Sequence, residues 1–115
     1  RMSRNTRTQV RHEAMQEGLK TAIRVPLKVM QIGDRCWPYM EEMAKHGNMN
    51  SKSDLEVGAR SLEVGIWGAY RNIVINMNDV EDEEWKRQIM DEADSMVSRA
   101  KSKVDVVLDT LDARG

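Results

Sequence analysis

The chain has 115 residues, which suffices for one small domain, and residues 1–115 are expected to form a single domain. Lysine plus arginine number 18 and aspartate plus glutamate 19, so the net charge is −1. This balance argues against nucleic acid as the main partner, since nucleic-acid-binding domains are usually basic. No apolar stretch approaches the length that spans a bilayer, so no membrane location is expected.

The composition favours helices and a reducing compartment. The chain contains nine Met, two Pro and no Phe, which suits a helical core of aliphatic side chains and methionine. Its single cysteine, Cys36, cannot form an internal disulfide, and this favours a cytoplasmic location. The first residue is Arg1 rather than Met, and we therefore expect a piece of a longer protein.

The first half of the chain predicts two helices. The first covers about residues 6–24 and has a thin apolar face, made of Val10, Ala14, Leu19 and Ala22. The second begins at Pro26, because proline suits the first turn of a helix, and ends at Gly47. Pro38 lies inside this second segment, where it is expected to kink the helix.

The second half predicts two further helices. Ser53 begins a capping-box pattern, and the third helix then runs to about Met77. Asp79 is the expected cap of the fourth helix. From Trp85 onward the apolar positions follow a three-and-four spacing: Ile89, Ala93, Met96, Val97, Ala100, Val104, Val107, Leu108 and Leu111. The predicted fold is an all-α bundle of about four long helices.

The third helix carries three glycines, each of which costs about 1 kcal/mol relative to alanine inside a helix. A rotation of about 100° per residue separates two faces. One is an apolar core stripe of Leu55, Ala59, Leu62, Ile66, Ala69, Ile73 and Met77. The other gathers small and polar residues: Asp54, Gly58, Ser61, Gly65, Gly68, Asn72 and Asn76. A helix with two packed faces is expected at the centre of its bundle.

Two interpretations of the small-residue face stay open. The glycines can let another backbone approach closely, as small residues do in membrane helix pairs. Alternatively they clear space for a ligand that the polar side chains bind. Asn72 and Asn76 favour the second interpretation, because two amides one turn apart offer donors and acceptors suited to the edge of a heterocycle.

Other kinds of chemistry lack their sequence signals. No HExxH or CxxC pattern occurs, and His12 and His46 have no third ligand at metal spacing, so no metal is expected. No phosphate loop, dinucleotide fingerprint or nucleophile elbow is present either.

Several motifs, in order and spacing, resemble the C-terminal part of the cyclodeaminase domain of the formiminotransferase-cyclodeaminase family. They are Gln16-Glu17-Gly18, Val25-Pro26-Leu27, Gly47-Asn48, Ser53-Asp54-Leu55-x-Val57 and Gly68-Ala69-x-x-Asn72-x-x-Ile75-Asn76. The resemblance covers nearly the whole chain.

The resemblance implies an all-helical, dimer-forming domain that acts on a tetrahydrofolate derivative. Cyclodeaminases convert 5-formiminotetrahydrofolate to 5,10-methenyltetrahydrofolate and ammonia, a step of histidine degradation and one-carbon metabolism. Nitrogen N10 must attack the formimino carbon, and the departing nitrogen must gain a proton. A positioned carboxylate or water relay could supply this, without a metal or a covalent nucleophile.

The resemblance places Asp54, Asn72 and Asn76 on motif positions, and we assign them to a folate pocket. Asp54 is the expected catalytic residue, as an acid/base or pterin-binding carboxylate, although it could instead only cap the helix. Ser61 and Gly65 share its face, and Lys52 flanks the loop that leads there; these three are further substrate-binding candidates.

The family domain also has an earlier helical portion, which these 115 residues do not contain. We expect either a fragment or a second chain that carries those helices. The expected partners are a folate, polyglutamylated or not, a further copy of the chain, and a formiminotransferase domain in the same full-length protein. Two alternative functions are a methenyltetrahydrofolate cyclohydrolase and a non-catalytic helical oligomerisation module.

Overall fold

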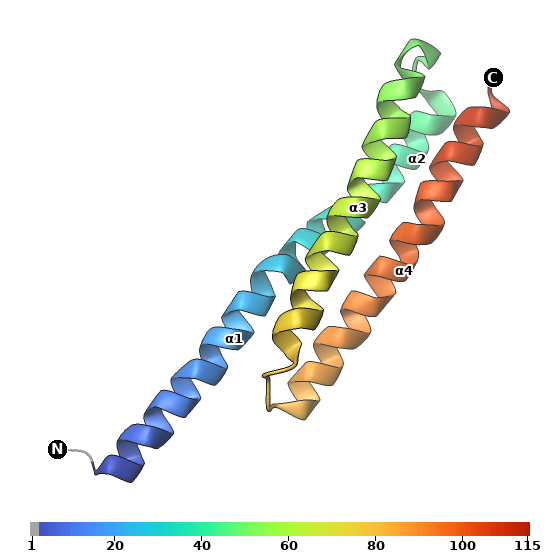
Figure 1. The fold of residues 1–115 in the computed structure, drawn as a ribbon. Helices are drawn as coiled ribbons and strands as arrows, with labels where there is room; N and C mark the ends of the chain where they lie inside the picture. Colours follow the sequence, from blue (N-terminus) through green and yellow to red (C-terminus); the bar gives the residue numbers. More distant parts are fainter. Residues whose placement is uncertain (1–2) are drawn as a thin grey trace.

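The computed structural model describes residues 3–115, and α-helices dominate it (Figure 1). In chain order it contains α1 (Arg4–Asp34), α2 (Trp37–His46), the short 3-10 helix η1 (Met49–Ser51), α3 (Lys52–Met77) and α4 (Glu83–Ala113). The predicted all-α bundle is confirmed, with long helices of 31, 26 and 31 residues and a shorter α2 of 10. Arg1, which begins the sequence, lies outside the described residues.

The bundle is elongated, and α3 is its central helix. The molecule measures 72 × 21 × 17 Å. Figure 1 shows α3 packed along both α1 and α4, while the N-terminal part of α1 extends beyond the other helices. The central position predicted for this helix is therefore confirmed.

A single apolar core runs along the bundle and follows the predicted stripes of α3 and α4. Its largest fully buried side chains are Trp37, Ile23, Met30, Ile66, Ile73, Leu111 and Val107. The apolar face predicted for the first helix was wrong at Val10, Ala14 and Ala22, which are exposed, and only Leu19 packs against the core. Full burial in α1 begins at Ile23, although Leu19 packs half-buried against the core and Gln16 and Lys20 contact the α3–α4 connection. The N-terminal turns of α1 extend beyond the other helices (Figure 1).

The two prolines do not act as predicted. Pro26 lies inside a continuous α1 and begins no new helix. An internal proline costs roughly 3 kcal/mol, but burial of Ile23, Leu27 and Met30 on both sides of it offsets that cost. The chain instead breaks at Arg35 and Cys36, so Pro38 falls in the first turn of α2. There its missing N–H leaves no helical hydrogen bond unmade.

Two predicted helix caps were also wrong. Ser53 lies inside α3, whose N-cap is Ser51 and carries no side-chain capping bond. Asp79 precedes the cap of α4, which is Asp82; its carboxylate accepts a hydrogen bond from the Trp85 N–H at 3.1 Å. A carboxylate cap was therefore right in kind for α4, three residues further along, whereas α3 begins without a side-chain cap.

Polar contacts join α1 to the α4 side of the bundle at several levels. Lys20 pairs with Asp82 at 2.7 Å, and Gln31 donates to Glu92 at 2.7 Å. The Asp34 carboxylate accepts two hydrogen bonds from the Arg99 guanidinium, at 2.7 and 3.1 Å. These hydrogen bonds raise the pKa of Arg99. They fix which side of α1 faces α4.

The Lys20–Asp82 pair predicts a pH-dependent stability. The Lys20 hydrogen bond, followed by that of the Trp85 N–H, lowers the pKa of Asp82 below its usual value of 3.8. The folded state therefore binds this proton less readily than the unfolded state, and the stabilisation is present above that value and lost as the pH falls through the lowered pKa. Asp82→Asn keeps an N-capping side chain but lacks the charge.

We expect wild type to have a higher urea midpoint than Asp82→Asn at pH 6. The difference should shrink to nothing as the pH falls below the lowered pKa of Asp82. Lys20→Met should reduce the same difference at pH 6. A gap between wild type and Asp82→Asn that is equally wide at pH 6 and pH 2 would contradict the linkage.

Candidate functional site

One end of the bundle contains a pocket that includes two predicted site residues. Its volume is about 390 Å³. The C-terminal end of α2, the connection through η1, the first turn of α3 and the last turn of α4 surround it. The lining residues are Met43, Gly47, Asn48, Met49, Ser51, Lys52, Asp54, Leu55, Leu111 and Arg114.

Two local features shape the connection that lines this pocket. At Gly47, a Cβ atom would collide with the backbone carbonyl oxygen of Met43, so the tight exit from α2 needs glycine. The Asn48 side chain accepts a hydrogen bond from the Asn50 N–H at 2.9 Å and opens η1. Together these residues turn the chain from α2 into α3 within a few residues.

The end of α4 closes the same pocket. The Arg114 guanidinium donates to the carbonyl oxygens of Ala44 at 2.8 Å and Gly47 at 2.9 Å. It thereby satisfies carbonyl groups that the end of α2 leaves without helical partners. Lys52 lies 3.5 Å from Asp112 of α4 and forms an ion pair with it. These contacts hold the pocket walls together.

The pocket combines an apolar lining with charged groups. Met43, Met49, Leu55 and Leu111 supply apolar surface, and Lys52, Asp54 and Arg114 supply charges of both signs. The Asp54 carboxylate is exposed in the first turn of α3. Such a mixture of apolar wall and few polar groups is typical of sites that bind small organic molecules.

The structure does not gather all the predicted site residues in this pocket. Lys52 and Asp54 line it, but α3 is a continuous helix that rises about 1.5 Å per residue. Asn72 and Asn76 therefore lie about 27 and 33 Å along the axis from Asp54. Within residues 3–115 the expected single cavity that joins Asp54 to both amides is not formed, because a straight helix spreads its residues along its length.

The small-residue face of α3 is open in this chain. Ser61, Gly65 and Asn72 are exposed, and Asn76 is half-buried with its amide nitrogen donating to the Asn72 carbonyl oxygen at 3.0 Å. A Cβ added at Gly65 or at Gly68 would meet no atom within 4 Å, and one at Gly58 would meet only the Met40 side chain at 3.3 Å. Packing within the described residues therefore does not require glycine at position 65 or 68.

The open space at Gly65 predicts that alanine there stabilises the isolated chain. Gly65→Ala should raise the free energy of unfolding by about 0.5–1 kcal/mol, because alanine restricts the unfolded chain and favours the helix. Urea denaturation followed by circular dichroism measures this. Gly47→Ala is the matched control, and it should destabilise the chain through the Met43 collision. A destabilised Gly65→Ala would show that the isolated chain itself uses that glycine.

Sequence patterns missed several residues of the pocket. Arg114 and Leu111 come from the end of α4, Met43 from the end of α2 and Met49 from η1. None of them belongs to a chemical motif, and only the fold brings them near Asp54. Asn48 is the exception, since it belongs to the Gly47-Asn48 pair that carries part of the family resemblance.

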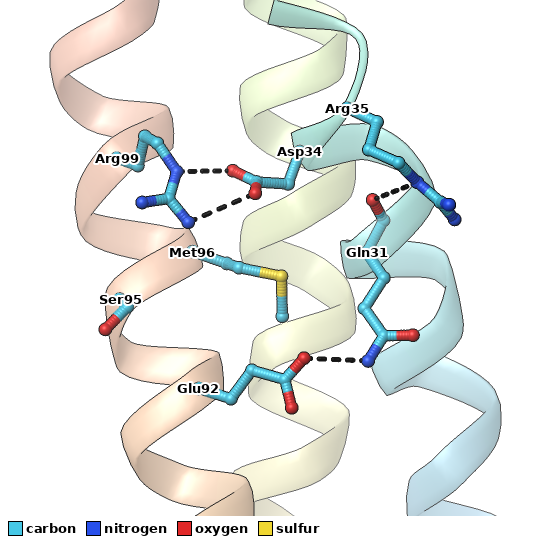
Figure 2. Close-up of a pocket in the computed structure, with 7 residues that line it drawn as sticks. All are labelled: Gln31, Asp34, Arg35, Glu92, Ser95, Met96 and Arg99. Carbon is cyan, nitrogen blue, oxygen red and sulfur yellow. Dashed lines mark hydrogen bonds and ion pairs between the residues drawn. The ribbon is translucent and has the colours of Figure 1, made fainter.

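A second hollow of about 490 Å³ lies between α1 and α4 (Figure 2). Figure 2 shows the Asp34–Arg99 pair and the Gln31–Glu92 hydrogen bond across it. Because these four side chains already bind one another, we interpret the hollow as a polar contact between α1 and α4.

Among residues 3–115, no group of three or more His, Cys, Asp or Glu side chains is placed to hold a metal ion. In the same residues, no helix combines the length and the apolar character needed to cross a bilayer.

Comparison with known proteins identifies the family. Residues 1–95 match the family described as Formiminotransferase-cyclodeaminase. The chain is 42% identical to Formimidoyltransferase-cyclodeaminase of Sus scrofa over 104 residues, or 90% of its own length. It is 44% identical to the protein of that name from Dictyostelium discoideum over 101 residues, or 88% of its length.

The matched region is only part of each relative. It makes up 19% of the Sus scrofa and Dictyostelium proteins, so the chain spans about a fifth of their length. A more distant relative, Methenyltetrahydrofolate cyclohydrolase of Methylorubrum extorquens, is 26% identical over 100 residues, which are 87% of this chain and 48% of that protein. The resemblance seen in the motifs is confirmed, and the chain belongs to the formiminotransferase-cyclodeaminase family.

Proposed function

We propose that this chain forms part of a folate cyclodeaminase, which converts 5-formiminotetrahydrofolate to 5,10-methenyltetrahydrofolate and ammonia. Family membership carries the proposal, since relatives at 40–44% identity are named formimidoyltransferase-cyclodeaminases. The bundle-end pocket supports it, because two of the predicted residues line one mixed apolar and charged cavity.

The reaction requires a proton to move between two nitrogens of the substrate. A bond forms between N10 and the formimino carbon, and the bond from that carbon to the terminal nitrogen breaks. The terminal nitrogen of the protonated formimino group (=NH2+) gains the proton that leaves N10 and departs as ammonia, and the positive charge stays on the 5,10-methenyl product. A carboxylate that accepts the first proton and returns it to the leaving nitrogen balances the step. We assign this role to Asp54.

The remaining pocket residues suit recognition of a folate. The apolar side chains of Met49, Leu55 and Leu111 can cover the faces of a flat ring, and the Asn48 amide can pair with a ring edge. The Lys52 ammonium can attract the carboxylate end of a folate or its polyglutamate tail. Ser61, Gly65, Asn72 and Asn76 stay candidates for a part of the site that the open face of α3 completes.

A swap experiment tests this function. The matched 101 residues of the Dictyostelium relative are replaced by the corresponding residues of this chain, and the chimera is supplied with 5-formiminotetrahydrofolate. We expect ammonia and 5,10-methenyltetrahydrofolate in equal amounts. A chimera that is folded and binds tetrahydrofolate but releases no ammonia would overturn the proposal.

The cyclohydrolase activity is the second candidate, and the Methylorubrum relative of that name favours it. The same chimera distinguishes the two. A cyclohydrolase would consume 5,10-methenyltetrahydrofolate with water and release no ammonia from the formimino substrate. A non-catalytic module is the third reading, and it predicts that folates leave the melting temperature of the chain unchanged.

Location and assembly remain part of the proposal. The single, half-buried Cys36 supports a reducing cytoplasm. The names of the relatives support a formiminotransferase domain in the same full-length protein. A role in histidine degradation is proposed from the family resemblance. Homo-oligomer formation is proposed from the family resemblance.

A further inference from the structure

The last turn of α4 is anchored before the chain reaches Arg114. The Leu111 side chain is buried and lines the bundle-end pocket. Asp112 forms an ion pair at 3.5 Å with Lys52, the first residue of α3. The backbone N–H of Arg114 donates to the Leu111 carbonyl oxygen at 3.1 Å, so the end of α4 stays helical in conformation. The backbone that carries the Arg114 side chain is therefore held in place.

The Arg114 guanidinium reaches the point where α2 ends. It donates to the carbonyl oxygens of Ala44 at 2.8 Å and Gly47 at 2.9 Å. A planar guanidinium with several fixed donors suits two neighbouring oxygens better than an ammonium does. The Gly47 carbonyl belongs to the planar peptide unit that joins Gly47 to Asn48. A hydrogen bond to its oxygen therefore fixes the plane from which the Asn48 backbone continues.

Asn48 is the residue at which this peptide plane meets the pocket. Its side chain accepts a hydrogen bond from the Asn50 N–H at 2.9 Å and caps η1. Asn48 and Met49 both line the pocket. A Cβ on Gly47 would collide with the Met43 carbonyl oxygen, so no side chain at this position can anchor the turn. The bond from Arg114 supplies that anchor from another helix.

We propose that Arg114 is a positioning residue for ligand recognition in the bundle-end pocket. It acts through the Gly47 carbonyl oxygen on Asn48 and Met49, the two groups assigned above to the edge and the face of a flat ring. Because the guanidinium donates to backbone oxygens, we assign it no contact with the substrate. The inference rests on the proposed function for the identity of the ring, and on these hydrogen bonds for the positioning.

The place of Asp54 separates recognition from chemistry. Asp54 lies in the first turn of α3, a continuous helix of 26 residues, whereas Arg114 binds the end of α2. Removal of the guanidinium should therefore loosen the turn at Asn48 and leave the proposed acid/base group in place. A loss of binding that is equal in the ground state and the transition state raises KM and leaves kcat unchanged.

Lys103 supplies a matched control. Its ammonium pairs with Glu41 at 2.6 Å, so it also joins α4 to α2. Neither of these two residues lines the pocket. Lys103→Met therefore weakens the same pair of helices without removing a bond to the Gly47–Asn48 peptide. If Arg114 only stabilised the packing of α2 on α4, variants at the two positions would behave alike.

Hydrogen exchange in the 115-residue chain tests the positioning without a ligand. The Asn50 amide donates to the Asn48 side chain, and we expect it to exchange about tenfold faster in Arg114→Ala than in wild type. Lys103→Met should change this rate by less than about twofold, even where it lowers the urea midpoint as much. Arg114→Lys serves if the alanine variant does not fold, and it should show about a fourfold change because an ammonium lacks the planar fork.

Steady-state kinetics of the Dictyostelium chimera test the effect on recognition. The swapped segment is carried through to Gly115, so that it includes Arg114. With 5-formiminotetrahydrofolate as substrate, we expect Arg114→Ala to raise KM about tenfold and to change kcat by less than about twofold. Lys103→Met should change both constants by less than about twofold.

Three results would overturn the inference. The first is an Asn50 amide that exchanges equally fast in Arg114→Ala and in wild type. The second is an equal rise of KM in Arg114→Ala and Lys103→Met, which would leave Arg114 a purely structural role. The third is a fall of kcat at unchanged KM. A chimera that releases no ammonia contradicts the proposed function instead, and the exchange of the Asn50 amide alone then decides whether Arg114 positions the turn.

Discussion

Trp37→Ala is expected to destabilise the chain by about 3–5 kcal/mol, because removing a buried aromatic ring loses its transfer free energy and leaves a cavity. The side chain is 1% exposed and begins α2 directly after the helix break. Small domains have a total stability of only about 5–15 kcal/mol. The variant should therefore approach complete unfolding, as measured by urea denaturation followed by circular dichroism.

Trp37→Phe separates the ring from its polar group. The indole nitrogen of Trp37 is buried and has no hydrogen-bond partner among the described residues. Phenylalanine retains much of the apolar volume and removes that unpaired N–H, so its loss of stability should be less than half that of alanine. A Trp37→Ala variant that unfolds at the wild-type urea midpoint would show that α2 is not held through this side chain.

Trp37→Ala should also change the shape of the pocket, because two residues at the end of α2 line it. Met43 and Gly47 line the cavity, and Arg114 binds the carbonyl oxygens of Ala44 and Gly47 at the end of α2. A looser α2 would widen the connection that carries Asn48. Trp37, directly after the break between α1 and α2, thus links the stability of the fold to the shape of the pocket. Neither the prolines nor the apolar spacing predicted a break at that position.

The periodicity of apolar residues correctly predicted the buried faces of the long helices, because each face depends on many residues. The apolar spacing of α4 and the core stripe of α3 repeat over seven or more positions, and burial follows them. Single residues were less reliable. Pro26 was predicted to begin a helix, because its local preference is for the first turn. In the structure the helix continues through Pro26, because the apolar residues before and after it are buried against other helices. Local sequence preferences do not contain these tertiary contacts.

The candidate site shows the same division. The rotation that gathered Asp54, Gly65 and Asn72 on one face was correct, and so was the continuity of α3. The prediction of one common cavity was wrong, because one face of a straight helix spans tens of ångströms. A pocket also needs walls from other segments of the chain. Those walls come from distant segments, such as Arg114, which only the folded chain brings to Asp54.

Two of the three glycines of α3 have no close neighbour that accounts for them within the described residues. Each weakens α3, yet a Cβ at Gly65 or Gly68 would meet no atom within 4 Å. This cost has no packing benefit within the described residues, and both interpretations of the small-residue face, close approach of another helix and space for a ligand, stay open.

Asp54→Asn is expected to lower the rate of ammonia release by about 10²–10⁴-fold in the Dictyostelium chimera, the usual contribution of a general acid or base. Asparagine has nearly the same shape but cannot carry a proton between N10 and the leaving nitrogen. Turnover is followed by ammonia release and by the absorbance of 5,10-methenyltetrahydrofolate. Because proton transfer occurs in the transition state, kcat should fall while KM changes little.

Glu56→Gln is the matched control, since this carboxylate lies two residues further along α3 and does not line the pocket. It should leave kcat within a few-fold of the unmodified chimera. A rise in KM without a fall in kcat for Asp54→Asn would instead assign Asp54 to binding of the pterin ring. Full turnover with unchanged folate affinity would remove Asp54 from the site altogether, and the carboxylate would then serve only the N-terminal dipole of α3.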